Sequence, residues 1–262
     1  MDTLRPFTNA AVVARYAEDT PRKVPGYADL HRMTMLLLAE HAPQDAEILV
    51  YGAGGGLELK AFAEAQPCWR LVGVDPSAEM LDLARAILGP LQARVELRQG
   101  YMEAAPQGPF DGAACLLTLH FLEQGERLAV LRDMRRRMKP GARLVIAHHS
   151  YPEGSEPMDW LARSIMFADT GGRNVGGVAG SAQMMTTQLP ILSSGDEEAL
   201  LESADFVRSP SSMPPSVFGA GSPPHDALSA SARLNDAARP VLPPRSLRRT
   251  STGLTMFLPG GG

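Results

Sequence analysis

The sequence has few cysteines, no excess of positive charge and no long apolar run, and each shortage excludes a class of protein. The two cysteines, Cys68 and Cys115, are too few for a disulfide framework and lie in apolar surroundings, which indicates a reducing compartment. No apolar run approaches the roughly 20 residues of a membrane-spanning helix, so no membrane partner is expected. The formal net charge of −4 gives no signal for nucleic-acid binding.

The start of the chain also lacks the long apolar core of a secretory signal peptide. Together with the cysteine content, this predicts a cytoplasmic protein. No Cys/His/Asp cluster has the spacing of metal ligands, so no metal site is predicted. The 262 residues, 44% of them apolar and 21% charged, suit one α/β domain with or without an appendage.

The most informative stretch is a short apolar run that enters a glycine-rich turn. Residues 48–51 are typical of a buried parallel strand, and Gly52, Gly54, Gly55 and Gly56 follow before a helical segment. Because glycine has no Cβ, this turn can bring a ligand against backbone N–H groups at the start of a helix. The stretch predicts a nucleotide-like ligand, and the alternative is a tight turn that binds nothing.

Apolar runs and amphipathic segments alternate through the first 150 residues. Strands are predicted at residues 48–51, 71–75, 95–99, 110–117 and 143–148, and helices at 8–20, 28–41, 57–65, from 76 onward and 124–138. Five strands that alternate with helices predict an α/β fold with a doubly wound, mostly parallel sheet and helices on both faces. Pro21 is expected to end the first helix.

The regular alternation lapses at residues 151–192. A helix is expected at 158–168, and a loose connection is expected where the glycines cluster at positions 171, 172, 176, 177 and 180. A long segment after the fifth strand is a natural lid over the carboxyl ends of the strands. A capped helix at 194–201 is expected to close the domain.

Asp75 ends the second predicted strand, about 20 residues after the glycine turn. A carboxylate there can accept hydrogen bonds from both hydroxyls of a ribose, which selects a nucleoside. The alternative for Asp75 alone is a surface cap on the next helix. A dinucleotide fingerprint would need glycine at position 57, and Leu57 disfavours an NAD-dependent oxidoreductase.

Five short motifs together resemble the class I S-adenosylmethionine (SAM)-dependent methyltransferases in order and spacing. They are residues 52–56, 74–77, 100–102, 110–112 and 138–141, and the resemblance covers residues 24–206. The resemblance implies a Rossmann-like sheet of seven strands, the last one antiparallel. It also implies SAM as the cofactor, lying across the carboxyl ends of strands one to four.

The resemblance also implies which residues hold each part of SAM. The glycine turn would face the methionine part, and Asp75 would face the ribose. The full predicted cofactor set is Tyr27, Gly52, Ala53, Gly54, Gly56, Asp75, Pro76, Met80, Tyr101, Met102 and Leu116. At two positions where the family has an acid, this sequence has another residue. These are Val50, before the first glycine, and Tyr101, after the third strand. Each replacement removes a polar contact worth about 1–3 kcal/mol.

A closer resemblance is to the carboxy-SAM synthase branch, which serves wobble-uridine modification in tRNA. Residues 24–27 and 117–127 carry it, and in that branch the tyrosine after Pro-Gly packs on SAM, which assigns Tyr27 to the cofactor. The branch also needs a basic lid residue for the extra carboxylate, and residues 181–185 have none. Since Arg173 is the only lid cation after Arg163, ordinary methyl transfer is preferred.

His148 is the candidate catalytic residue, because it ends the fifth strand beneath the lid, where a general base could reach a substrate. The alternative is a structural histidine at a strand end. SAM is an activated sulfonium, so positioning and a nearby base suffice. The predicted function is methyl transfer to a small molecule or modified nucleoside; carboxy-SAM synthesis and SAM binding without catalysis are the alternatives.

Residues 207–262 differ in composition from the domain predicted at residues 1–206. They are rich in proline and serine and show little apolar periodicity, which predicts a disordered tail. We therefore expect the last strands of the sheet to be missing, and we interpret the tail as the product of a frameshift near Phe206. The alternative is a genuine interaction tail in which Arg245, Arg248 and Arg249 form a weak basic patch.

Overall fold

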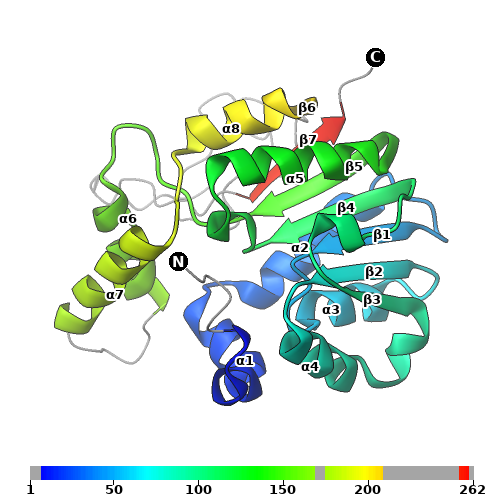
Figure 1. Cartoon of the computed structure of the whole chain (residues 1–262), viewed down its shortest axis with the longest axis horizontal. Coiled ribbons are helices and arrows are strands. Elements are labelled where there is room, and N and C mark those ends of the chain that lie inside the picture. Colours follow the sequence, from blue (N-terminus) through cyan, green and yellow to red (C-terminus); the bar gives the residue numbers. More distant parts are fainter. Residues whose placement is uncertain (1–6, 169–174, 209–253, 260–262) are drawn as a thin grey trace, which may run out of the picture.

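The structure, a computed structural model, describes residues 7–168, 175–208 and 254–259. In these residues seven strands form one sheet in the order β3-β2-β1-β4-β5-β7-β6, with helices on both faces (Figure 1). The strands are β1 Glu47–Tyr51, β2 Arg70–Asp75, β3 Val95–Gln99, β4 Phe110–Leu116, β5 Met138–Ala147, β6 Phe206–Arg208 and β7 Leu254–Pro259. The first five pair in parallel, which confirms the predicted doubly wound sheet.

The sheet changes winding direction beside β1. The chain runs from β1 outward through β2 to β3, and then returns so that β4 pairs with the other side of β1. At such a switch point the loops after two neighbouring strands diverge, and a crevice forms at the carboxyl ends of the strands. The glycine turn follows β1 and Asp75 ends β2, so both predicted features lie at this crevice.

Both faces of the central strands are buried, as expected for a parallel sheet between helices. Along β1, Ile48 and Val50 pack into one apolar cluster, whereas Leu49 and Tyr51 pack into another on the opposite face. Helices α2 Tyr27–Ala39, α3 Leu57–Ala65 and α4 Ala78–Leu88 contribute to the first cluster, and α5 Gln124–Arg136 and α8 Ser194–Ser203 to the second. The remaining helices are α1 Ala10–Lys23, α6 Pro157–Ala168, α7 Val175–Gln188 and the 3-10 turns η2 Gly89–Arg94, η3 Met102–Ala104 and η4 Leu119–Phe121.

The prediction that Pro21 ends the first helix is wrong, because α1 continues to Lys23. Proline removes one N–H donor, but it does not prevent the following residues from bonding back to the helix. The Val24 N–H donates to the Thr20 carbonyl at 3.0 Å, and the last turn therefore persists. At the other end, the Asn9 side chain accepts from the Ala11 N–H at 3.0 Å and caps the helix.

The loose connection predicted around the second group of glycines is also wrong, because these glycines lie within α7. A helical glycine costs about 1 kcal/mol relative to alanine, and burial elsewhere in the helix can outweigh this. Val178 and Ala182 of α7 are buried, which provides that compensation. Glycines 171 and 172 and Arg173 lie outside the described residues.

The expectation of missing C-terminal strands is wrong for residues 254–259. These residues form β7, which pairs antiparallel with β5 from Leu144↔Phe257 to Ala147↔Leu254 and also pairs with β6. The seventh position of the sheet is therefore filled in the way that the family resemblance implied. The sequence Leu-Thr-Met-Phe-Leu-Pro is a short apolar run typical of a strand, but the proline-rich composition around it hid this signal. The rest of the predicted tail, including the three arginines, lies outside the described residues, and the frameshift stays a hypothesis.

Candidate cofactor site

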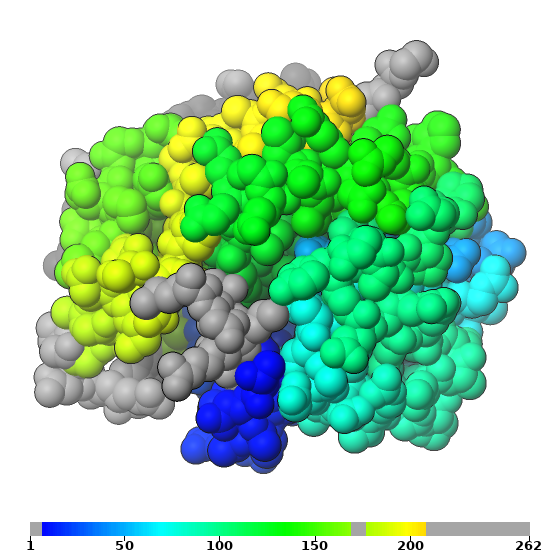
Figure 2. Space-filling view, viewed as in Figure 1, coloured from blue at the N-terminus to red at the C-terminus, as the bar shows by residue number. Residues whose placement is uncertain are grey.

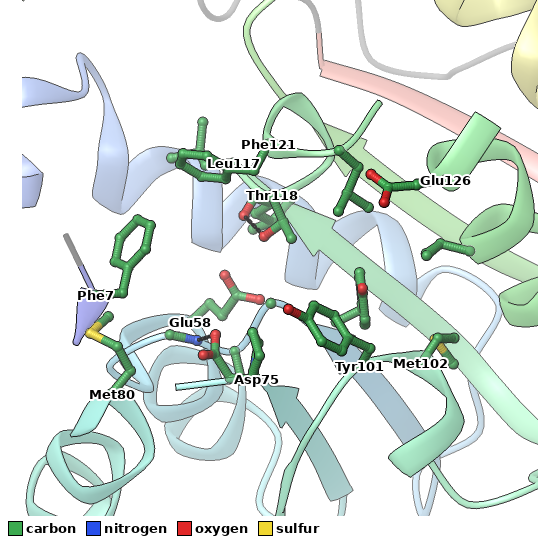
Figure 3. Close-up of a pocket in the computed structure, with 18 of the residues that line it drawn as sticks. Phe7, Glu58, Asp75, Met80, Tyr101, Met102, Leu117, Thr118, Phe121 and Glu126 are labelled. Carbon is green, nitrogen blue, oxygen red and sulfur yellow. Dashed lines mark hydrogen bonds between the residues drawn. The ribbon is translucent and has the colours of Figure 1, made fainter. Parts of the chain in front are cut away.

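A cavity of about 710 Å³ opens at the carboxyl ends of β1, β2 and β4, at the switch point of the sheet (Figure 3). This volume lies in the range of small-molecule sites. Its wall comes from the glycine turn, from the loops after β2, β3 and β4, and from α1, α2 and α5. Figure 3 shows Phe7 and Met80 on one side of the cavity and Tyr101 and Met102 on the other.

The glycine turn is fixed in place by its neighbours on both sides. The N–H groups of Gly52 and Ala53 donate to the Val74 carbonyl of β2 at 2.8 and 3.0 Å. Gly52 has a φ of +78°, and a Cβ there would lie 2.0 Å from Thr118 Oγ1 in the loop after β4. Only glycine satisfies both the backbone conformation and this close approach.

Asp75 connects the end of β2 to the glycine turn. Its Oδ2 accepts from the Gly54 N–H at 2.8 Å, and its Oδ1 accepts from the Ser77 N–H at 2.9 Å. Burial raises the pKa of this carboxyl, and the two backbone hydrogen bonds oppose that rise. An ionised carboxylate has about four acceptor positions, so Asp75 can hold the turn and still accept from ligand hydroxyls.

Aromatic and apolar side chains form the wall beside Asp75. The rings of Phe7 and Phe121 meet edge to face, with centroids 5.4 Å apart, and both line the cavity. Pro76 and Met80 line the cavity from the start of α4. These flat and flexible apolar groups can pack against a heteroaromatic ring.

The first two helices close the cavity above the glycine turn. Tyr16 of α1 and Tyr27 of α2 both line it, and their phenols share a hydrogen bond. The Tyr16 hydroxyl lies 3.3 Å from the place that a Cβ on Gly54 would occupy. Burial raises the pKa of both phenols, so both are neutral near pH 7.

The predicted lid does not cover the cavity in the described part of the chain. Within residues 151–168 and 175–192 no side chain lines it, and α6 and α7 lie beside the sheet (Figure 1). The N-terminal helix and Phe7 take the covering position instead. The role of residues 151–192 as a lid stays a prediction.

The structure brings together every residue of the predicted cofactor set except Gly56. Gly56 is the N-cap of α3 with a φ of +78°, and a Cβ there would lie 2.8 Å from the Ala84 Cβ of α4. The absence of a side chain at Gly56 therefore allows α3 and α4 to pack closely. The contacts of the other residues with a ligand stay predictions.

His148, the predicted catalytic residue, is not part of the cavity wall. It is buried, and its Nε2 lies 3.2 Å from Glu197 Oε1 of α8, which also pairs with the buried Arg127 of α5. Burial raises the pKa of Glu197, but His148 and Arg127 outweigh this, so that the pKa is lowered. The imidazole therefore helps to join α8 to the sheet, and its catalytic role stays a prediction.

Several cavity residues were missed by the sequence analysis. The most informative are Tyr16, Thr118, Phe121 and Glu58. Glu58 carried a readable signal, because it is an acid in the first helical turn directly after the glycines. By contrast, Val50 stands where the family has an acid. Its side chain is fully buried on the face of β1 that packs against α2 and α3.

The charges around the cavity are mostly negative. The carboxyl groups of its wall are Glu58, Asp75, Glu103, Glu126 and Asp133, and the only cation of the wall in the described residues is Arg136, which pairs with Asp133. Such a wall favours a cationic or neutral ligand over an anionic one.

The described residues contain no cluster that could hold a metal ion, and none of their helices has the length and apolar content of a membrane span.

A glycine turn tied to an acid at the next strand, at the switch point of a doubly wound sheet, defines a nucleoside-binding α/β protein. Residues 48–141 match the family of methyltransferase domains. This match and the sheet order, in which an antiparallel β7 lies between β5 and β6, support a class I SAM-dependent methyltransferase.

Three individual proteins illustrate the similarity. A carboxy-S-adenosyl-L-methionine synthase from Chromohalobacter salexigens is 28% identical over 154 residues, 57% of each chain. The ubiquinone/menaquinone biosynthesis C-methyltransferase UbiE from Syntrophotalea carbinolica is 31% identical over 105 residues, 40% of this chain and 44% of that one. A crystal structure from Nostoc punctiforme, of a protein proposed to be an O-methyltransferase, superposes with a TM-score of 0.55 at 19% identity, over 75% of this chain and 54% of that one, and shows the fold alone. The chain thus spans between 44% and 60% of the length of the curated relatives that it matches.

The residues present fit SAM, the cofactor of this family. Asp75 has acceptor positions left for two ribose hydroxyls, and the wall of Phe7, Met80 and Phe121 suits an adenine ring. Gly52 and Gly54 line the cavity with backbone alone, while Thr118 lies close to Gly52 and Tyr16 close to Gly54. Glu58 provides a buried carboxyl group for a positively charged part of the ligand.

Proposed function

We propose that the protein binds SAM in this cavity and transfers its methyl group to a small molecule or a modified nucleoside. The observation that carries the proposal is the pair formed by Asp75 and Gly54 at the switch point, because it combines a ribose acceptor with a glycine turn that lines the cavity. The methyltransferase domain match over residues 48–141 supports the same reading. We also propose a cytoplasmic location, since both cysteines are free thiols.

The residues of the chain would act by binding and orientation. When bound, SAM supplies a methyl group that is already activated by a positively charged sulfur. Asp75 would fix the ribose, the glycine turn would fix the amino-acid end, and the aromatic wall would exclude water around the adenine. These contacts would hold the reacting group in one place while the acceptor approaches.

A second candidate is carboxy-SAM synthesis, because several of the curated relatives carry that name. This reaction needs a site for an additional carboxylate on the cofactor. The described cavity wall offers Arg136 alone as a cation, and that residue is paired with Asp133. A carboxylate would meet an excess of negative charge, and we therefore rank methyl transfer first.

The test is a transfer screen with SAM labelled in its methyl group, followed by mass spectrometry of the cofactor that copurifies with the protein. The labelled methyl group should appear in a small-molecule or nucleoside fraction of a cell extract, and the copurified cofactor should have the mass of SAM. Copurified carboxy-SAM would favour the second candidate. Binding of SAM without any transfer would favour a non-catalytic SAM-binding protein.

A further inference from the structure

Glu58 is a buried carboxyl group that faces the cavity without a partner of opposite charge. It is the second residue of α3, directly after the glycine turn, and its exposed fraction is 6%. Its Oε1 atom is buried and has no hydrogen-bond partner in the described chain. Figure 3 shows its side chain in the middle of the site, between Asp75 and Thr118. A buried carboxylate with no partner is costly, so this group must either be protonated or receive a cation from outside.

The titratable groups that interact electrostatically with Glu58 come from four elements, and none of them is cationic. They are Asp75 at the end of β2, Tyr16 of α1, Tyr27 of α2 and Cys115 of β4. Burial, and then the negative charge of Asp75, raise the pKa of Glu58 well above its ordinary value. Burial also raises the pKa of both phenols and of the Cys115 thiol, so these groups are neutral near pH 7.

We propose that Glu58 binds the α-ammonium group of SAM and thereby selects ligands with a positively charged amino-acid end. This assignment rests on the proposed function. Glu58 follows the turn that would face the methionine part, and the ammonium N–H groups would donate to its unpartnered oxygen. The carboxyl group is ionised in the complex, and the proton that it carries in the empty cavity passes to solvent. Binding of SAM is therefore coupled to the release of a proton.

The proposal separates ligands that share the adenosine part. S-adenosylhomocysteine keeps the ammonium group but has a neutral sulfur, so Glu58 stabilises it as it stabilises SAM. 5′-Methylthioadenosine lacks the amino-acid end altogether and gains nothing from this residue. The three ligands thus distinguish a contact with the ammonium from a contact with the sulfonium.

The experiment is isothermal titration calorimetry of the full chain with these three ligands, in two buffers of different ionisation enthalpy. Glu58→Gln keeps the shape of the side chain and should weaken SAM and S-adenosylhomocysteine by about 10- to 100-fold, with no change for 5′-methylthioadenosine. The variant should also abolish the proton release. Glu64→Gln, an exposed position on the same helix, is the matched control and should change nothing.

Two outcomes would overturn the assignment alone. An equal loss for all three ligands would make Glu58 a structural residue, and a loss for SAM without a loss for S-adenosylhomocysteine would place it at the sulfonium. Failure of the unsubstituted protein to bind either charged ligand would contradict the proposed function itself. If Glu58→Gln does not fold, Glu58→Asp takes its place: it should bind SAM more weakly and still release the proton, and binding without proton release would contradict the proposal.

Discussion

The carboxylate of Asp75 accepts a hydrogen bond from the backbone N–H of Gly54 at 2.8 Å, which links the ends of two neighbouring parallel strands. One acid thus shapes the glycine turn and also presents free acceptor positions to the cavity. Its second oxygen holds the Ser77 N–H, where the next helix begins. The ligand-binding surface and the local backbone therefore depend on the same side chain.

Replacement of Asp75 should weaken the binding of SAM. Asp75→Asn replaces one acceptor oxygen by a donor and leaves either a backbone N–H or a ribose hydroxyl unpaired, at a cost of about 1–3 kcal/mol. We expect SAM affinity to fall about 10- to 100-fold, measured by calorimetry. Asp82→Asn, an exposed position on α4, is the control. Equal affinity of the Asp75 and Asp82 variants would contradict the assignment of the ribose contact.

Substitution of Gly52 should destabilise the protein through one identified clash. Gly52→Ala must adopt a φ of +78° and place its Cβ against Thr118, and we expect a loss of about 2–4 kcal/mol in the free energy of unfolding by urea. Gly141→Ala has a similar φ of +76° but open space around it, and should lose only about 1 kcal/mol. Adding Thr118→Ala should restore part of the stability of Gly52→Ala, and no restoration would exclude the clash as the cause.

The buried pair of Glu197 and Arg127 predicts a pH dependence of stability. The pKa of Glu197 is lowered in the folded protein, so its contribution is present above the ordinary carboxyl pKa and is lost as the pH falls through the folded value. Glu197→Gln leaves Arg127 buried without its counterion and should cost about 3–5 kcal/mol near pH 7. The difference between the two proteins should shrink as the pH is lowered below about 4.5. A difference that does not change between pH 7 and pH 3 would contradict this.

The last strand should contribute to stability although it is separated from β6 by more than forty residues in the chain. Truncation after residue 253 removes β7 and exposes an edge of β5, so the melting temperature should fall and aggregation should rise. Truncation after residue 259 keeps β7 and serves as the control. Equal melting temperatures of the two truncated proteins would show that β7 does not stabilise the sheet.

The sequence predicted the parts of the fold that depend on local patterns. Short apolar runs gave the five parallel strands, and the glycine turn with Asp75 located the cavity, because the carboxyl ends of parallel strands meet at one edge. The covering elements were not predicted, since Tyr16 and Phe7 reach the cavity only through the packing of α1. Likewise, residues 254–259 have a local pattern typical of a strand, but the pairing of β7 with β5 depends on a partner far away in the chain. His148 was placed at the correct strand end, but which neighbour its side chain meets depends on α8.

The central claim is that the cavity binds SAM, and calorimetry of the full chain with SAM and with NAD tests it most directly. Saturable binding of SAM to one site, weakened about 10- to 100-fold in Asp75→Asn and not competed by NAD, is the result that the proposed function predicts. Tighter binding of NAD than of SAM would contradict it.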